Sequence, residues 1–157
     1  MWWGTDSQGV DRVAVRAGHV LSWPTGEACA QAAGEAGWVG LRAADGDETI
    51  GQSAFDFRPT MAWLRGQRCS LDPVSALNLW NFSGDITAST GGPPWPVFSR
   101  LASQCHSKLT VANVPWLAGR ADYQPRWTAV QLRCVRQELN HAVHVLRTQL
   151  PELMSGP

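Results

Sequence analysis

The clearest helical pattern in the chain lies in residues 128–151, which read TAVQLRCVRQELNHAVHVLRTQLP. Thr128 and Gln131 have the spacing of a capping box, in which two side chains satisfy backbone N–H groups at a helix start. Apolar residues then recur at steps of three and four, which is typical of one helix face: Leu132, Val135, Leu139, Val143, Leu146 and Leu150. Pro151 ends the run, so the stretch predicts an amphipathic helix.

The opposite face of this helix is polar and partly basic, with Arg133, Arg136, Gln137, Asn140, His141, His144 and Arg147. A solvated surface explains it simply. A contact surface for an acidic protein or for a nucleic-acid backbone is the alternative. Three arginines can neutralise few phosphates, so nucleic-acid binding through this helix would be weak and salt-sensitive.

Two further helices are predicted upstream. Asp72-Pro73 is an N-cap followed by proline at the first helical position. The residues after it are apolar almost all round, which favours a central helix packed on several sides: Val74, Ala76, Leu77, Leu79, Trp80, Phe82 and Ile86. Gly91 to Pro96 breaks this helix. Helical spacing then resumes at Val97, Phe98, Leu101, Ala102, Cys105 and Leu109.

The first half of the chain has shorter and weaker patterns. Residues 13–23 predict one strand, or two broken near Gly18, and Thr25 caps a helix over about 26–36 with Gly37 as its stop. Residues 38–41 and 48–57 suggest strands, and residues 58–66 suggest a helix with Pro59 in its first turn. The sequence predicts an α+β fold, with a small N-terminal β-containing layer and a mainly helical C-terminal half. A chain of 157 residues predicts a single domain, 1–157.

Composition narrows the classes of function. No apolar run is long enough to span a membrane, and the N-terminus lacks the order of a signal peptide, so a cytoplasmic protein is expected. The net charge is zero, but residues 1–99 carry 6 basic and 10 acidic side chains while residues 100–157 carry 7 and 3. Such asymmetry can orient a charged partner. The cysteines have no close pair and predict buried free thiols: Cys29, Cys69, Cys105 and Cys134.

No catalytic motif stands out. The chain has no nucleophile elbow and no glycine-rich phosphate loop, so no catalytic residue and no cofactor is predicted. His141 and His144 could share a metal ion, but no third ligand is evident and no metal site is predicted. One alternative stays open: a small enzyme or small-molecule binder with a pocket near Asp72, Asp85, His106 and Asn113.

Tryptophan is unusually abundant, with nine residues against one tyrosine. Trp95, Trp116 and Trp127 stand in proline-containing segments. Rigid loops that present tryptophan near arginine are typical of interface hot spots, although such rings can equally cover a core. The predicted partner-binding residues are Trp95, Trp116, Trp127, Arg133, Arg136, His141, His144 and Arg147.

Three segments carry a resemblance. Residues 71–85, LDPVSALNLWNFSGD, resemble a Leu-Asn-x-Trp-Asn helix of small actinobacterial proteins, and residues 108–115, KLTVANVP, resemble the Lys-Leu-x-x-x-Asn-x-Pro stretch that follows it there. A final helix led by a tryptophan comes next, here from Trp127. Proteins of this size and texture include immunity proteins that neutralise a cognate toxin. The resemblance therefore implies a bacterial, non-enzymatic protein-binding module of the immunity type, and it carries over no functional residue.

Overall fold

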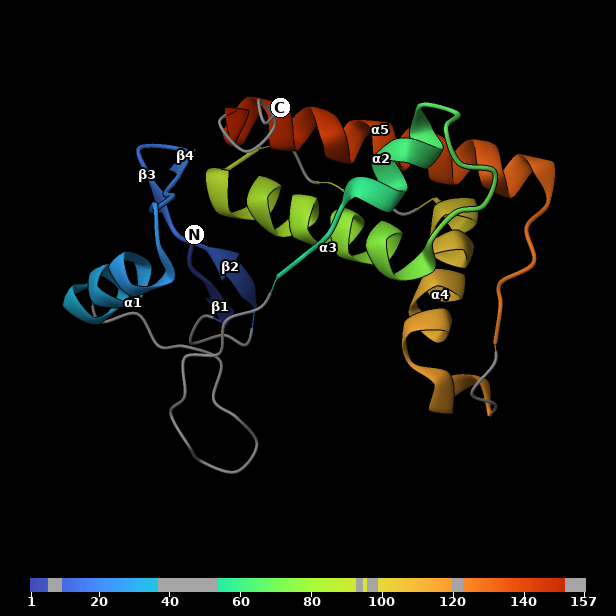
Figure 1. The fold of residues 1–157 in the computed structure, drawn as a ribbon, viewed down its shortest axis with the longest axis horizontal. Coiled ribbons are helices and arrows are strands. Elements are labelled where there is room, and N and C mark those ends of the chain that lie inside the picture. Colours follow the sequence, from blue (N-terminus) through green and yellow to red (C-terminus); the bar gives the residue numbers. More distant parts are fainter. Residues whose placement is uncertain (6–9, 37–53, 93–94, 96–98, 120–122, 152–157) are drawn as a thin grey trace.

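A central helix organises the computed structural model, which describes residues 1–5, 10–36, 54–92, 95, 99–119 and 123–151. Within these residues, four short strands precede five α-helices (Figure 1). The central helix is α3 (Pro73–Thr90). Helix α5 (Ala129–Gln149) lies alongside it, α4 (Arg100–Asn113) packs near its first half, and the strands lie at its far end. The predicted α+β layout with a mainly helical second half is confirmed.

The strands form two small antiparallel pairs. β1 (Trp3–Thr5) pairs with β2 (Asp11–Val13), and β3 (Val15–Arg16) pairs with β4 (His19–Val20). The predicted break near Gly18 is the turn of the second pair, where Ala17 and Gly18 both have positive φ values, 51° and 79°. Two consecutive left-handed residues match the twist of a tight hairpin. The β1–β2 pair was not among the predicted strands.

Helix α3 is buried on several sides, as its sequence predicted. The Asp72 side chain accepts a hydrogen bond from Ser75 N, and Gly91 ends the helix with a φ of 72°. Trp80 is fully buried at the middle of the helix. One cluster of buried side chains joins α3 to β2, β4, α2, α4 and α5. The helix therefore forms the axis of the core.

The capping box of α5 is present as predicted. Thr128 Oγ1 accepts from Gln131 N at 3.2 Å, and Gln131 Oε1 accepts from Thr128 N at 3.1 Å. The buried residues of the helix are Val135, Leu139, Ala142, Val143 and Leu146. Ser83 of α3 lies against this face. Its hydroxyl is 2.7 Å from the carbonyl oxygen of Leu79 in α3 and 3.3 Å from that of Ala142 in α5. A small residue at this point lets the two helices approach closely.

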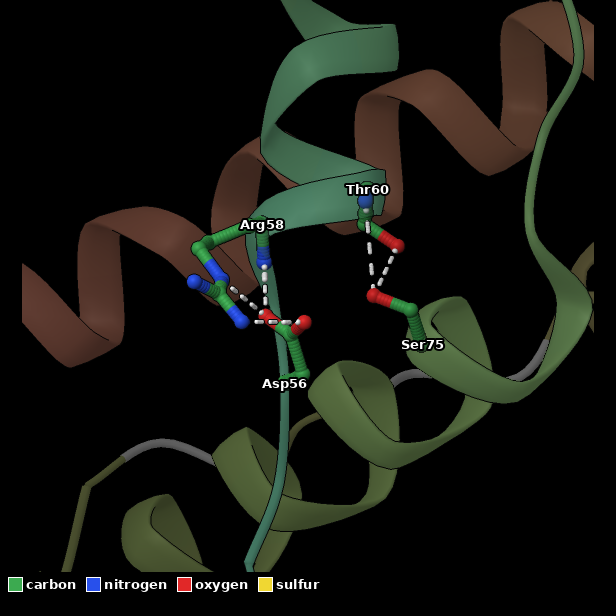
Figure 2. A network of polar contacts seen from close by, with 4 residues as sticks. All are labelled: Asp56, Arg58, Thr60 and Ser75. Carbon is green, nitrogen blue, oxygen red and sulfur yellow. Dashed lines mark hydrogen bonds and ion pairs between the residues drawn. The ribbon is translucent and has the colours of Figure 1, made fainter.

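A short helix, α2 (Arg58–Leu64), covers one side of the α3–α5 pair. Its start is fixed twice (Figure 2). The Asp56 carboxylate accepts from the backbone N of Arg58 at 3.0 Å and from its Nε at 2.8 Å, which lowers the pKa of Asp56. Thr60, fully buried, donates to Ser75 Oγ from its hydroxyl at 2.8 Å and from its backbone N at 3.3 Å.

Other expectations have mixed outcomes. Helix α1 (Gly26–Glu35) is capped by Thr25 as predicted. The Gly37 stop, the strand at 38–41, and Val97 and Phe98 lie outside the described residues. Of the strand predicted over 48–57, only residues 54–57 are described, and they form no strand. None of the helices in the described ranges combines the length and apolar character that crossing a membrane requires.

Candidate protein interface

Trp116 is the most exposed large apolar side chain of the described residues, at 79% exposure, and its neighbour Leu117 is 58% exposed. Both stand on a 3-10 helix, η1 (Pro115–Ala118), which follows α4 directly. The turn is closed by hydrogen bonds from Leu117 N to Val114 O at 2.9 Å and from Gly119 N to Trp116 O at 3.3 Å. Gly119 then ends it with a φ of 68°, a conformation that favours glycine.

The base of this turn is fixed to the rest of the molecule. Asn113, the last residue of α4, donates from Nδ2 to the carbonyl oxygen of Pro73 at 3.1 Å and to that of Leu109 at 2.9 Å. The end of α4 is thereby tied to the start of α3, where Val74 is also exposed at 52%. We call Trp116 and Leu117 the apical pair. It is an apolar projection on a braced turn, at the end of α4 that points away from α5 (Figure 1).

Trp95 lies differently from the apical pair. It is half-buried against the core, and its Nε1–H donates to Glu138 Oε2 at 3.2 Å. Its ring centroid is 4.7 Å from that of His141 on α5. Trp95 therefore covers the flank of α5, which agrees with the alternative interpretation that such rings cover the core.

Trp127 also packs against the core and is half-buried. The ammonium of Lys108 lies 5.5 Å from its ring centroid. The same ammonium donates to the Arg126 carbonyl at 2.6 Å and to Gln131 Oε1 at 2.8 Å. Lys108, which was not among the predicted site residues, thus fastens the segment before α5 to α4.

The predicted basic face of α5 is divided by the structure. Arg133, His141, His144 and Arg147 are exposed. Arg136 is half-buried instead, because it donates from Nη1 to the Leu64 carbonyl at 2.9 Å and lies over the Trp63 ring. His141 and His144 are near each other, with ring centroids 6.5 Å apart. No group of three metal-binding side chains occurs in the part of the chain that the structure describes.

The residues of the alternative pocket are spread along α3. Asp72 caps the first turn, and Asp85 lies thirteen residues further, about 20 Å along a helix axis. Asn113 of α4 donates a hydrogen bond to the carbonyl of Pro73, the residue after Asp72. His106 of α4 lies instead at the middle of α3, where its Nε2 is 2.8 Å from Asn81 Oδ1. The structure therefore does not gather the four residues in one pocket. Burial lowers the pKa of His106.

Asp85 has the most perturbed carboxyl group among the described residues. It is half-buried where the first two strands meet α3, and burial is the largest cause that raises its pKa to about 6. The negative charge of Asp11 raises the pKa further, while the Trp3 indole and Arg12 lower it. Strand β2, which carries Asp11 and Arg12, is docked on α3 by two hydrogen bonds: Arg12 Nη1 donates to Ala88 O at 3.2 Å, and Val13 N donates to Ser89 Oγ at 3.0 Å.

The expectation of buried thiols holds for Cys29 and Cys105. It is wrong for Cys69, which is exposed in the connection between α2 and α3, and Cys134 is half-buried. All four are free.

Comparison with protein-family models, with curated proteins and with solved structures finds no match to this chain. The resemblance to actinobacterial proteins therefore stays a prediction.

Proposed function

We propose that this chain is a protein-binding module whose contact surface is centred on the apical pair. The observation that carries the proposal is the 79% exposure of Trp116 on a turn that is closed by its own hydrogen bonds and tied to α3. Exposing a large aromatic ring has no benefit for the isolated chain, because burial of its area would be favourable. Because the backbone of the turn is already fixed, it loses little further conformational entropy when a partner covers the ring.

The size of the apical pair fits a hot spot rather than a whole interface. Tryptophan is enriched among the few residues that dominate binding, and removal of such a residue typically costs about 2 kcal/mol or more. Specific interfaces bury about 800 Å² on each partner, so surrounding side chains must contribute the rest of the area. Val74 is a candidate, because its end of α3 is tied to the base of the turn.

The most concrete form of the proposal is an immunity-type protein that binds a bacterial toxin and covers its active site. This form rests on the resemblance carried by residues 71–85 and 108–115. The apical pair would insert into an apolar recess of the toxin. Charge would then set orientation, since the described exposed face of α5 carries Arg133 and Arg147.

The test is to express the tagged chain in its own host and to identify by mass spectrometry what co-purifies with it. The variants Trp116→Ala and Leu117→Ala should lose at least about 10-fold of a specific partner protein. Val10→Ala is the matched control, because Val10 is another exposed apolar residue (41%) and lies in the N-terminal layer. Purification of the chain without any protein partner would overturn the proposal, as would equal recovery with Trp116→Ala. A toxin partner must in addition be inhibited by the wild-type chain.

The two other functions have less support. Arg136 is engaged with Leu64 and Trp63, so only Arg133 and Arg147 remain exposed of the three arginines predicted on α5. Two phosphate contacts would give a salt slope of only about −2 in log–log terms. The pocket alternative loses its basis because Asp72 and Asp85 are far apart on one helix.

A further inference from the structure

Two cysteines from different helices lie together inside the molecule. Cys105 of α4 is fully buried, and its Sγ lies 3.7 Å from the Gln131 carbonyl oxygen of α5. Cys134 follows Gln131 by less than one helical turn and is half-buried. Burial raises the pKa of both thiols, and each thiol also shifts the pKa of the other: Cys105 lowers that of Cys134, whereas Cys134 raises that of Cys105. The helices are packed against each other along this stretch.

We propose that Cys105 and Cys134 form a reversible disulfide that links α4 to α5 covalently when a small oxidised disulfide is present. The inference rests on the position of both residues where α4 packs against α5, with Cys105 Sγ 3.7 Å from the carbonyl oxygen of the residue three positions before Cys134, and it is independent of the proposed protein partner.

The exchange proceeds in two balanced steps. Cys134 loses its proton, and its thiolate attacks one sulfur of the small disulfide, so that a mixed disulfide forms and one small thiolate leaves. Cys105 then loses its proton and attacks Cys134 Sγ, which releases the second small thiolate. Both cysteine sulfurs are oxidised, and one molecule of small disulfide is reduced to two thiols.

The surroundings decide the order of these steps. Cys134 reaches solvent; burial raises its pKa overall, while the neighbouring Cys105 thiol lowers it. Burial is also the largest cause that raises the pKa of Cys105 to about 12. Reaction is therefore slow near neutral pH. It accelerates about 10-fold for each pH unit below these pKa values, because the thiolate is the reacting form.

The link would constrain residues 106–133, the segment that includes the apical pair. In the reduced protein two hydrogen bonds hold this segment. Asn113 ties the end of α4 to Pro73 of α3, and Lys108 of α4 binds the carbonyl of Arg126 before α5. A covalent closure across the same helices removes conformations from the unfolded chain, so the oxidised protein unfolds at a higher temperature.

The experiment uses a Cys29→Ala/Cys69→Ser chain, in which only Cys105 and Cys134 remain, treated with oxidised glutathione without denaturant. The expected product is a monomer lighter by two hydrogens, with no glutathione attached and with a Tm raised by several degrees, which reductant reverses. Adding Cys105→Ser should instead give a stable glutathione adduct on Cys134.

Three results would overturn the proposal: a lasting glutathione adduct in the chain that retains both cysteines, a covalent dimer, or two thiols still free after treatment at raised pH. Cys134→Ser provides the second control. It leaves the buried Cys105 in place, should form neither ring nor adduct, and does not depend on whether Cys105→Ser folds.

Discussion

The guanidinium of Arg136 lies over the indole of Trp63, with Cζ 4.2 Å from the ring centroid. Arg136 also donates from Nη1 to the carbonyl of Leu64, the last residue of α2. One side chain of α5 therefore stacks on the buried ring of α2 and satisfies a carbonyl at its C-terminal end. A cation at this end also interacts favourably with the helix dipole.

Replacing Arg136 should destabilise the protein. We expect Arg136→Ala to lower the free energy of unfolding by about 1–2 kcal/mol, from the lost stacking and hydrogen bond. Arg136→Lys should recover only part of this, because an ammonium lacks the planar fork. Urea unfolding followed by circular dichroism measures both. Arg133→Ala, on the exposed face of the same helix, is the control and should change stability by less than about 0.5 kcal/mol. Equal effects of Arg133→Ala and Arg136→Ala would contradict the assigned role.

The Thr60–Ser75 pair predicts a ranking of two variants. Ser75 Oγ accepts from both the hydroxyl and the backbone N of Thr60, in a fully buried position (Figure 2). Thr60→Val removes one hydrogen bond, whereas Ser75→Ala removes both and leaves a buried N–H unsatisfied. We expect about 1 kcal/mol for Thr60→Val and up to about 3 kcal/mol for Ser75→Ala. The measurement is again chemical denaturation, and the reverse ranking would show that this pair does not anchor α2.

Local signals account for what the sequence predicted well. The boundary signals act through hydrogen bonds or dihedral angles within a few residues, and the helices begin or end beside them: Asp72-Pro73, Gly91 and Thr128. The β1–β2 pair escaped prediction because each strand has three residues. Its position depends on contacts with α3, such as that from Val13 N to Ser89 Oγ, 76 positions along the chain.

The candidate site also depends on contacts between residues that are far apart in the sequence. Trp95, Trp116 and Trp127 have similar proline-containing surroundings in sequence, yet only Trp116 is largely exposed. Trp95 is covered because Glu138 accepts its N–H from 43 positions away, and Trp127 because it packs on the core below Lys108. No local pattern contains this information. The residue pair that forms the proposed disulfide was likewise hidden, since its members are far apart in sequence.

The capping box of α5 predicts a measurable contribution from a single hydroxyl. Thr128→Ala should lower the free energy of unfolding by about 1 kcal/mol, because Gln131 N loses its acceptor. Thr148→Ala is the matched control. Among the described residues, that hydroxyl bonds only to the carbonyl of His144 within the same helix, and Thr148 is exposed, so loss of the hydroxyl should have little effect. Thermal unfolding of both variants checks this, and a larger effect at Thr148 would contradict it.

Asp85 predicts how stability depends on pH. Its pKa is about 6 in the folded protein against 3.8 for the ordinary group, so the folded state holds its proton more tightly. Stability from this group is therefore gained as pH falls from about 6 towards 3.8, and it is absent at neutral pH. After discounting for solvent exposure, the gain should be about 1–2 kcal/mol.

Asp85→Asn should stabilise the protein near neutral pH by a similar amount and flatten this part of the stability profile. Asp11→Asn, which removes only the second cause, should do so less, and urea unfolding across the pH range measures all three. A wild-type profile that falls on acidification through this window, with Asp85→Asn destabilising at neutral pH, would show that the ionised carboxylate is the form that the fold stabilises.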